Sequence, residues 1–194
     1  MPDTRPEGKV NFGLKSCHVA KLTIGVDAST SAETYTYDTP IAWPGAVSLT
    51  MDASTEESTF AADDNPRYWS AWNNGGRTGT LEIASVPQAV RTAIFRDTVD
   101  ANGVLVESDE EPYPFALLYE QQTDKNPERF VIYNCMASKP GMGSSTKTNQ
   151  TTPNTRSISL PARLRNGKPM SASTTQNVNA ETFANWFSHV YEST

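Results

Sequence analysis

Few side chains in this sequence are of the types that act as nucleophiles, bases or metal ligands. His18 adjoins Cys17, but neighbouring residues of a strand point to opposite faces, which makes a Cys–His dyad geometrically poor there. His189 and Cys135 lie far from this pair in the sequence, and no His-x-x-x-His or Cys-x-x-Cys spacing occurs. We therefore expect two buried free thiols, no enzyme activity, no metal and no cofactor.

Three polar motifs have some features of binding sites. Asp63-Asp64 and Glu110-Glu111 could bind a hard cation, but neither pair has the alternating oxygen spacing of a calcium loop. The glycine-rich segment 141–147 lacks the Gly-Lys-Ser/Thr order of a phosphate loop, and no helical pattern follows it. Solvated side chains explain these motifs better than bound ligands do.

Aromatic residues are the remaining candidates for recognition. Trp43 precedes a Pro-Gly pair, and Tyr68, Trp69 and Trp72 lie close together in the sequence. Exposed aromatic rings stack on sugars or anchor interfaces, although core packing is their most common use. Two classes are thus compatible with the residues alone: a self-assembling structural protein and a β-rich binding module.

The composition favours strands connected by turns. The 194 residues are only 37% hydrophobic, and they include 23 Thr and 18 Ser, which suit pleated strands and turns respectively. The length predicts a single domain, residues 1–194. The longest apolar run, Phe115 to Tyr119, is far shorter than the ~20 residues of a membrane span. The first residues also lack the apolar segment of a secretory signal, so we expect no membrane association.

Alternating or continuous apolar residues predict six strands, and Asn-Gly pairs predict three hairpin turns. The segments 115–120 and 129–137 are nearly continuously apolar, which is typical of strands covered on both faces. Asn-Gly pairs favour tight hairpin turns because both residues tolerate a positive φ. The other predicted strands are 18–24, 47–51, 78–84 and 155–164, and the predicted turns are Asn74-Gly75, Asn102-Gly103 and Asn166-Gly167.

Two segments have the periodicity of helices. Residues 85–94 begin with the spacing of a capping box and carry one apolar face. Residues 180–191 follow Asn179, a plausible cap, and carry an apolar stripe that would dock either on the chain's own sheet or on a partner. That stripe consists of Phe183, Trp186, Phe187, Val190 and Tyr191.

Long polar connections separate these elements. Residues 27–40 and 139–154 are almost wholly polar, and residues 1–10 form an N-terminal arm. Loops beyond ~12–15 residues are uncommon in a compact domain unless they have a function, so they indicate either interaction elements or disorder.

Charge is distributed unevenly along the chain. The net charge of −6 divides into −8 for residues 97–128, +5 for residues 129–194 and −3 for the rest. Regions of opposite sign suit head-to-tail contacts between identical subunits, although they could also face each other within one fold. The acidic pI of about 4.9 argues against a protein that binds the nucleic-acid backbone.

The order and spacing of several motifs resemble those of the major tail proteins, or tail tube proteins, of long-tailed non-contractile bacteriophages, especially those of Gram-positive hosts. The resemblance extends from about residue 10 to residue 191. The motifs that carry it are Asn11-Phe12-Gly13-Leu14-Lys15, Pro44-Gly45-Ala46-Val47, Phe60-Ala61-Ala62-Asp63-Asp64, Asn73-Asn74-Gly75, the segments 79–84, 102–107, 114–120 and 129–135, and Trp186-Phe187-x-x-Val190-Tyr191.

This resemblance implies an antiparallel β-sandwich or barrel-like core with one flanking helix, a C-terminal helix and long inter-strand loops. It implies a structural virion protein without catalytic residues, whose rings, typically hexameric, stack into the tail tube that conducts double-stranded DNA to the host. Assembly would take place in the host bacterial cytoplasm with a tape-measure protein and tail initiator and terminator proteins.

The resemblance also suggests roles for individual residues. An acidic lumen would repel DNA and let it slide, and the candidates for that lumen are Glu107, Asp109, Glu110, Glu111 and Asp124. Candidates for contacts between subunits are Asp27, Tyr35, Tyr37, Lys139, Lys147, Arg156, Trp186 and Tyr191. The alternative is a carbohydrate- or receptor-binding β-module that uses Trp43, Tyr68, Trp69 and Trp72.

Overall fold

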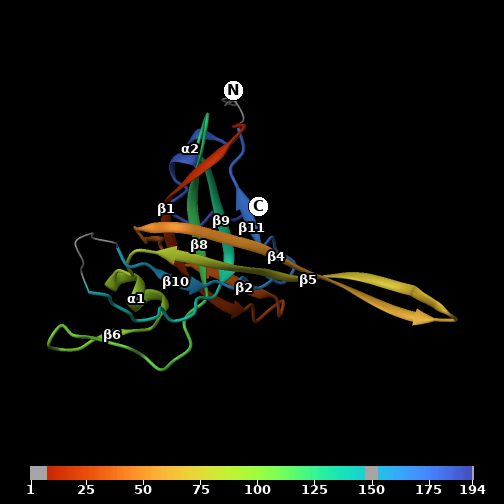
Figure 1. Ribbon diagram of the computed structural model, residues 1–194, viewed down its shortest axis with the longest axis horizontal. Coiled ribbons are helices and arrows are strands. Elements are labelled where there is room, and N and C mark those ends of the chain that lie inside the picture. Colours follow the sequence, from red (N-terminus) through yellow and green to blue (C-terminus); the bar gives the residue numbers. More distant parts are fainter. Residues whose placement is uncertain (1–7, 147–152, 194) are drawn as a thin grey trace.

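The structure is a computed structural model that describes residues 8–146 and 153–193. It consists mostly of antiparallel strands, so the fold is mainly β, as expected from the sequence (Figure 1). In chain order the elements are β1 (Asn11–Val26), β2 (Glu33–Tyr37), β3 (Ile41–Ala42), β4 (Ala46–Ala62), β5 (Asn65–Ile83), α1 (Gln88–Ile94), β6 (Thr98–Val99), β7 (Leu105–Val106), β8 (Phe115–Thr123), β9 (Glu128–Cys135), β10 (Arg156–Ser159), β11 (Ser171–Ser173) and α2 (Ala180–Ala184).

The larger sheet has the strand order β11-β9-β8-β1-β2, and β3 also pairs with β1. Its central strands β8 and β9 are largely buried on both faces, which confirms the interpretation of their apolar sequences. In β8, Phe115 and Leu117 point into one hydrophobic cluster, whereas Ala116 and Leu118 point into another. The larger sheet is thus covered by an apolar layer on each side.

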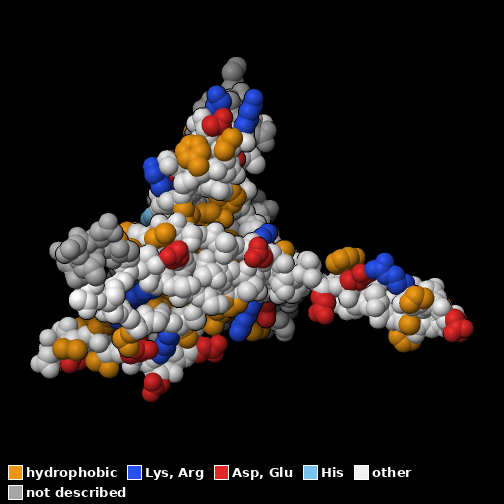
Figure 2. Space-filling view, viewed as in Figure 1, with side chains coloured by type: hydrophobic (Ala, Val, Ile, Leu, Met, Phe, Trp, Pro, Cys, Tyr) orange, Lys and Arg blue, Asp and Glu red, His pale blue; other side chains and the backbone are white. Residues whose placement is uncertain are grey.

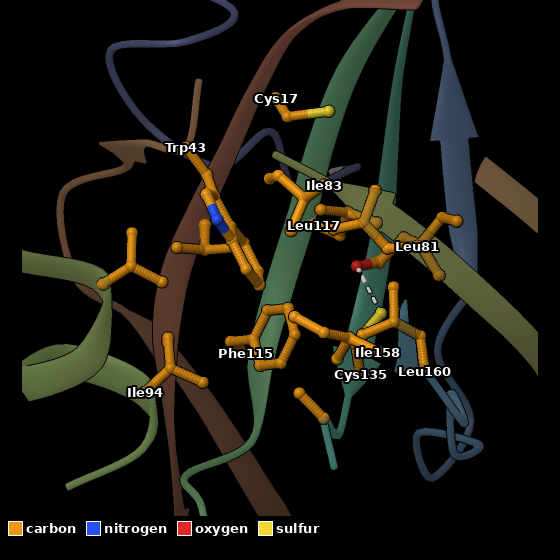
Figure 3. Packing of buried hydrophobic residues seen from close by; sticks show 14 of the residues in the cluster. Cys17, Trp43, Leu81, Ile83, Ile94, Phe115, Leu117, Cys135, Ile158 and Leu160 are labelled. Atoms are coloured by element: carbon orange, nitrogen blue, oxygen red, sulfur yellow. Dashed lines mark hydrogen bonds between the residues drawn. The ribbon is translucent and has the colours of Figure 1, made fainter. Parts of the chain in front are cut away.

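The main hydrophobic core lies between the larger sheet and a smaller sheet with the order β10-β5-β4. Leu81 and Ile83 of β5 and Ile94 of α1 are fully buried there. Figure 3 shows Trp43 reaching into the same core toward Phe115. The alternation of apolar and polar residues in β5 therefore places one face of the smaller sheet on the core.

The two sheets are joined along one side. Ala162 forms β-bridges both to Arg77 of β5 and to Cys135 of β9. Gly76 permits this close approach, because its φ is +99° and a Cβ there would collide with the carbonyl oxygen of Ala162. Strand β11 pairs with the same edge of β9, at residues 130–132, and β4 is the outer strand of the smaller sheet within the described residues. The two sheets therefore form one curled half-barrel, in which β4 and β11 each keep one unpaired edge within the described residues.

The C-terminal residues cover the outer face of the larger sheet. Trp186 is buried there, and its Nε1 donates a 3.3 Å hydrogen bond to the carbonyl oxygen of Phe130. Val190 belongs to the same cluster, and the ring of Tyr191 stacks on that of Trp186 with 5.4 Å between centroids. The apolar stripe predicted near the C-terminus therefore packs on the chain's own sheet.

Both helices are shorter than predicted. Helix α2 is capped by Asn179, as expected, but it ends at Ala184 instead of continuing to residue 191. The chain turns at Asn185, which lets Trp186 reach the sheet, and that burial outweighs further helical hydrogen bonds. Helix α1 begins at Gln88 without a side-chain cap, so the predicted capping box does not form. Neither described helix is long and apolar enough to span a membrane.

The predicted polar loop 27–40 contains a strand. Tyr35 and Tyr37 of β2 pair with Ile24 and Leu22 of β1 in antiparallel register. The alternation of threonine and tyrosine places both tyrosines on one half-buried face. The prediction of a loop was wrong over residues 33–37, because the packing of these rings outweighs the polar composition. In the second predicted loop, the described residues 139–146 and 153–154 form no helix or strand.

Two of the three predicted Asn-Gly turns are present. Asn102-Gly103 lies in the connection between β6 and β7, and Asn166-Gly167 lies between the bridged residues Arg165 and Lys168. Asn74-Gly75, however, lies inside β5 next to an irregularity of the ladder. A turn at that position would have ended the hairpin near the body of the protein. Instead, β4 and β5 continue well beyond it.

This extension forms an arm, defined here as residues 54–76. Beyond Ala53 and Arg77, β4 and β5 pair only with each other in the described structure. Figure 1 shows the twisted two-stranded ribbon projecting away from the rest of the protein. Within the described residues, the backbone of the arm is therefore held by its own ladder.

Candidate interaction surfaces

The arm exposes four large aromatic side chains, distributed over its two faces. Phe60 lies opposite Trp69 in the ladder, so these two rings share one face, which we call the Phe60 face. Tyr68 and Trp72 lie on the other face, because residues of a strand alternate in direction. The exposed fractions are 58% for Phe60, 55% for Trp69, 60% for Tyr68 and 71% for Trp72.

So much exposed aromatic surface on a two-stranded ribbon indicates a contact surface. An isolated hairpin is only marginally stable in water, and a ribbon with two unpaired edges favours association. Figure 2 shows these apolar side chains along the arm, interspersed with acidic ones. Large aromatic rings are the side chains that contribute most energy when an interface buries them.

The tip of the arm is a turn made by Asp63 and Asp64. Both residues have positive φ, +50° and +57°, which is the backbone of the tight turn that suits twisted hairpins. Aspartate tolerates this conformation better than most residues do. Both side chains are exposed, and no cluster of three metal-ligating side chains occurs in the described residues. The acidic pair therefore serves as a turn, a role that the sequence interpretation missed.

Charge distinguishes the two faces of the arm. Glu57 lies on the face of Trp72, and its carboxylate pairs with Arg67 at 2.6 Å. Glu56 lies on the Phe60 face, and within the described residues it forms no ion pair. The Phe60 face thus combines two exposed rings with an uncompensated carboxylate.

A groove of about 660 Å³ lies at the root of the arm, between β4 of the smaller sheet and the strands β1, β8, β9 and β11 of the larger sheet. Apolar side chains gather where the upper strands meet β4 (Figure 2). Apart from Arg77, the groove is lined by apolar and uncharged polar residues, with no acidic side chain among them. Its principal side chains are Leu14, Leu49, Met51, Tyr119 and Phe130.

Arg77 is the cation of this groove. Its side chain is half-buried, and it forms no ion pair with any residue that the structure describes. Tyr119 stacks on Phe130 at 5.0 Å beside it. Burial raises the pKa of Tyr119, and the positive charge of Arg77 acts in the opposite direction. The groove therefore offers aromatic surface and one positive charge that has no ion-pair partner in the described part of the chain.

The five lumen candidates occupy two separate places. Glu107, Asp109, Glu110 and Glu111 lie together in the connection from β7 to β8, where Glu107 pairs with Lys139 at 3.7 Å and Glu110 pairs with Arg96. Asp124 lies in the turn between β8 and β9, at the other end of the molecule (Figure 1). It accepts a 2.7 Å hydrogen bond from the backbone N–H of Lys9, which helps to lower its pKa.

Most of the predicted inter-subunit residues have partners within their own chain. Tyr37 accepts a hydrogen bond from Arg165, and the hydroxyl of Tyr35 accepts one from the backbone of Asn166 at 2.9 Å. Asp27 accepts hydrogen bonds from Ser29 and the backbone of Thr30, which lower its pKa to about 2. Trp186 and Tyr191 pack on the larger sheet, Lys139 pairs with Glu107, Arg156 begins β10, and Lys147 lies outside the described residues.

The four aromatic residues predicted for the alternative function, a binding module, do not form one continuous surface. Trp43 is fully buried in the main core, and its Nε1 donates a 3.1 Å hydrogen bond to the carbonyl oxygen of Ser85. This corrects its selection as a recognition residue. Tyr68, Trp69 and Trp72 are exposed on the arm, but they point to different faces.

The cysteines and His18 have structural surroundings. Cys17 and Cys135 are free and buried, as predicted, and burial raises the pKa of each thiol to about 12. The His18 ring stacks on Phe187 with 4.7 Å between centroids. Packing holds both thiols away from solvent, whereas His18 is only half-buried.

The sequence reasoning missed the arm and the groove. The relevant signal was present: two polar, β-favouring runs flank Asp63-Asp64 symmetrically, and aspartate is common in turns. Asn74-Gly75 is a stronger local turn signal than Asp63-Asp64, so the sequence pattern predicted the turn at the wrong position. No family model matches this chain, and no curated protein matches its sequence.

Proposed function

We propose that this chain is the self-assembling subunit of a bacteriophage tail tube. Its copies would join into stacked rings, typically hexameric in the family it resembles, around a channel for double-stranded DNA. The observation that carries the proposal is the projecting arm with its four exposed rings, since such a surface requires a partner. The open half-barrel groove provides a second, different surface on the same chain.

An arm at one place and a groove at another favour a heterologous contact. Contacts of that type join identical subunits head to tail, and they close into a ring when the rotation allows it. The antiparallel β-fold agrees with the fold that the resemblance implies. In this proposal the protein belongs to the virion tail, and a tape-measure protein and initiator and terminator proteins control its assembly in the host cytoplasm.

The acidic character of the chain supports passage of DNA without specific binding. The segment 97–111 contains six acidic residues and no basic residue, and all of these acids except Asp97, which is buried and paired with Arg91, are exposed. An acidic wall around a channel would repel the phosphate backbone, whereas basic side chains would retain it.

The proposal is tested by the state of the concentrated protein. Sedimentation velocity and negative-stain microscopy should reveal rings or tubes of constant diameter at high concentration. The matched control replaces residues 54–76 by Asn-Gly between Ala53 and Arg77, which removes the arm and keeps the body. This variant should fold and remain monomeric. A wild-type protein that stays monomeric at every concentration would overturn the proposal.

The exposed Tyr68, Trp69 and Trp72 favour one alternative, a carbohydrate- or receptor-binding module. Glycan-array binding and tryptophan fluorescence titration distinguish it from self-assembly. A monomer that binds one glycan class, and loses that binding when Trp72 becomes Ala, would favour the module. The tail tube subunit should bind no glycan in either form.

A further inference from the structure

We propose that the Phe60 face of the arm docks into the groove of a second copy of this chain, with the carboxylate of Glu56 next to the guanidinium of Arg77. This inference rests on the self-association proposed above and specifies its contact. The occupant of the groove is thus the same protein, and each copy has both halves of the interface.

The arm cannot reach the groove of its own chain. The groove includes Met51, which lies on the same strand as Phe60. Nine residues of extended strand separate the two, which is about 30 Å at ~3.3 Å per residue. The β4–β5 ladder maintains that distance, because it keeps both strands extended from the pair Ala46–Ile83 to the pair Ala62–Asn65. The contact must therefore form between copies.

The Phe60 face complements the groove in polarity. The groove has apolar and aromatic side chains around one cation, Arg77, which forms no ion pair within the described residues. The Phe60 face has two rings and the carboxylate of Glu56. On the other face of the arm, Arg67 already neutralises Glu57. Charge therefore favours docking through the Phe60 face.

Charge also argues against one other projecting segment, residues 97–111, as the docking site. The arm contains four acidic residues and one basic residue, and the segment 97–111 is purely acidic. Like charges facing each other across an interface repel. The groove is lined without any acidic side chain, and its lining includes residues of β4 and β11, each of which has one unpaired edge within the described residues. An extended segment can add backbone hydrogen bonds at such edges.

Disulfide trapping tests the contact directly. Ala71 lies on the Phe60 face, opposite Ser58, and Ser173 lies at the groove. Two differently tagged proteins, A71C and S173C, are mixed under mild oxidation, and the mixed disulfide should form rapidly. The matched control is S70C, one residue along the strand and on the opposite face. Its disulfide with S173C should form at least tenfold more slowly. Equal rates for A71C and S70C would overturn the proposed face.

A charge exchange tests the pairing of Glu56 with Arg77. R77E should raise the concentration needed for assembly at least tenfold, and E56R in the same chain should restore most of the loss. The matched control, E57R with R77E, should restore none of it. Circular dichroism and urea unfolding establish that each variant is folded. Failure of E56R to restore assembly in a folded R77E protein would overturn the pairing.

The outcomes separate this inference from the proposed function. Rings or tubes of the wild-type protein without the A71C–S173C disulfide and without restoration by E56R would overturn the docking site alone. A wild-type protein that never associates would overturn both. Trapping together with restoration would support the docking site independently of the geometry of the final assembly.

Discussion

At the scale of single residues, Arg165 shows how a charge is accommodated inside this protein. Its side chain is fully buried, and its Nε and Nη2 donate hydrogen bonds to the carbonyl oxygen of Pro169 at 2.9 and 2.7 Å. Its Nη1 pairs with the carboxylate of Glu192 at 2.7 Å, and the guanidinium lies 3.8 Å from the ring centroid of Tyr133. One residue thereby holds the C-terminal segment against the larger sheet.

We expect Arg165→Met to destabilise the protein by about 2–4 kcal/mol, because it removes several hydrogen bonds and the buried half of an ion pair. Urea unfolding measures the change. The control is Lys168→Met, an exposed cation in the same turn, which should change stability by less than ~0.5 kcal/mol. Similar effects of the two substitutions would contradict the role given to Arg165.

The two buried thiols predict a loss of stability at alkaline pH. Because burial raises their pKa to about 12, the unfolded chain releases these protons first, near the ordinary pKa of about 8.5. The stabilisation is complete below about pH 8, and above it declines by about 1 kcal/mol per pH unit for each thiol.

Urea unfolding between pH 7 and pH 10.5 measures this decline in the wild type and in the Cys17→Ala, Cys135→Ala double variant. The wild type should lose stability more steeply than the variant above pH 8.5. Parallel curves would show that the thiols do not carry this pH dependence.

At the scale of secondary-structure elements, the C-terminal segment and the arm use similar residues differently. Trp186 is 3% exposed and closes the second hydrophobic layer, whereas Trp72 is 71% exposed on the arm. The difference arises because α2 ends early enough to return the chain to the sheet, while the β4–β5 ladder carries its rings away from it.

This contrast predicts that replacement of each tryptophan by alanine will have very different effects on the stability of the monomer. Trp186→Ala should cost about 3–5 kcal/mol in the free energy of unfolding, because it leaves a large cavity. Trp72→Ala should change the stability of the monomer by less than ~0.5 kcal/mol. Thermal or urea unfolding of dilute protein decides between them. A marked loss of stability for Trp72→Ala would mean that the arm packs on its own body.

At the scale of the whole molecule, three parts project from the body: the arm, the acidic connection through β6 and β7, and the upper end of β1, β8 and β9 (Figure 1). The proposed ring uses the arm and the groove for contact. It leaves the acidic segment 97–111 free to face the channel. Asp124 at the opposite end would face a different level of the same tube.

If that segment lines the channel, assembled tubes of the wild type should not retain double-stranded DNA. Asp109→Lys with Glu111→Lys should make the tubes retain DNA at low salt and release it as salt increases, since phosphate contacts are salt-dependent. Neither residue forms an ion pair within the described part of the chain.

The control for this experiment makes the same charge change elsewhere, with Asp38→Lys and Glu181→Lys, two exposed acids outside the segment. Co-sedimentation of tubes with labelled DNA, combined with protection from nuclease, measures retention inside the channel. Equal retention by both variants would remove Asp109 and Glu111 from the lumen.

The sequence by itself determined the β-class, the strands buried on both faces and the burial of both thiols. These features depend on composition and on the apolar pattern within one segment, which a strand expresses wherever it pairs. The predicted C-terminal stripe was also real, although it does not continue as a helix beyond Ala184.

Only the tertiary structure decided where the long hairpin turns, that Arg165 is buried, and that Arg77 lies in a groove lined by both sheets. At Asn74-Gly75 the local turn preference yielded to a ladder that extends to Asp63-Asp64. Strand pairing and groove formation depend on segments that lie far apart in the chain. No local sequence pattern predicts how such segments pack together.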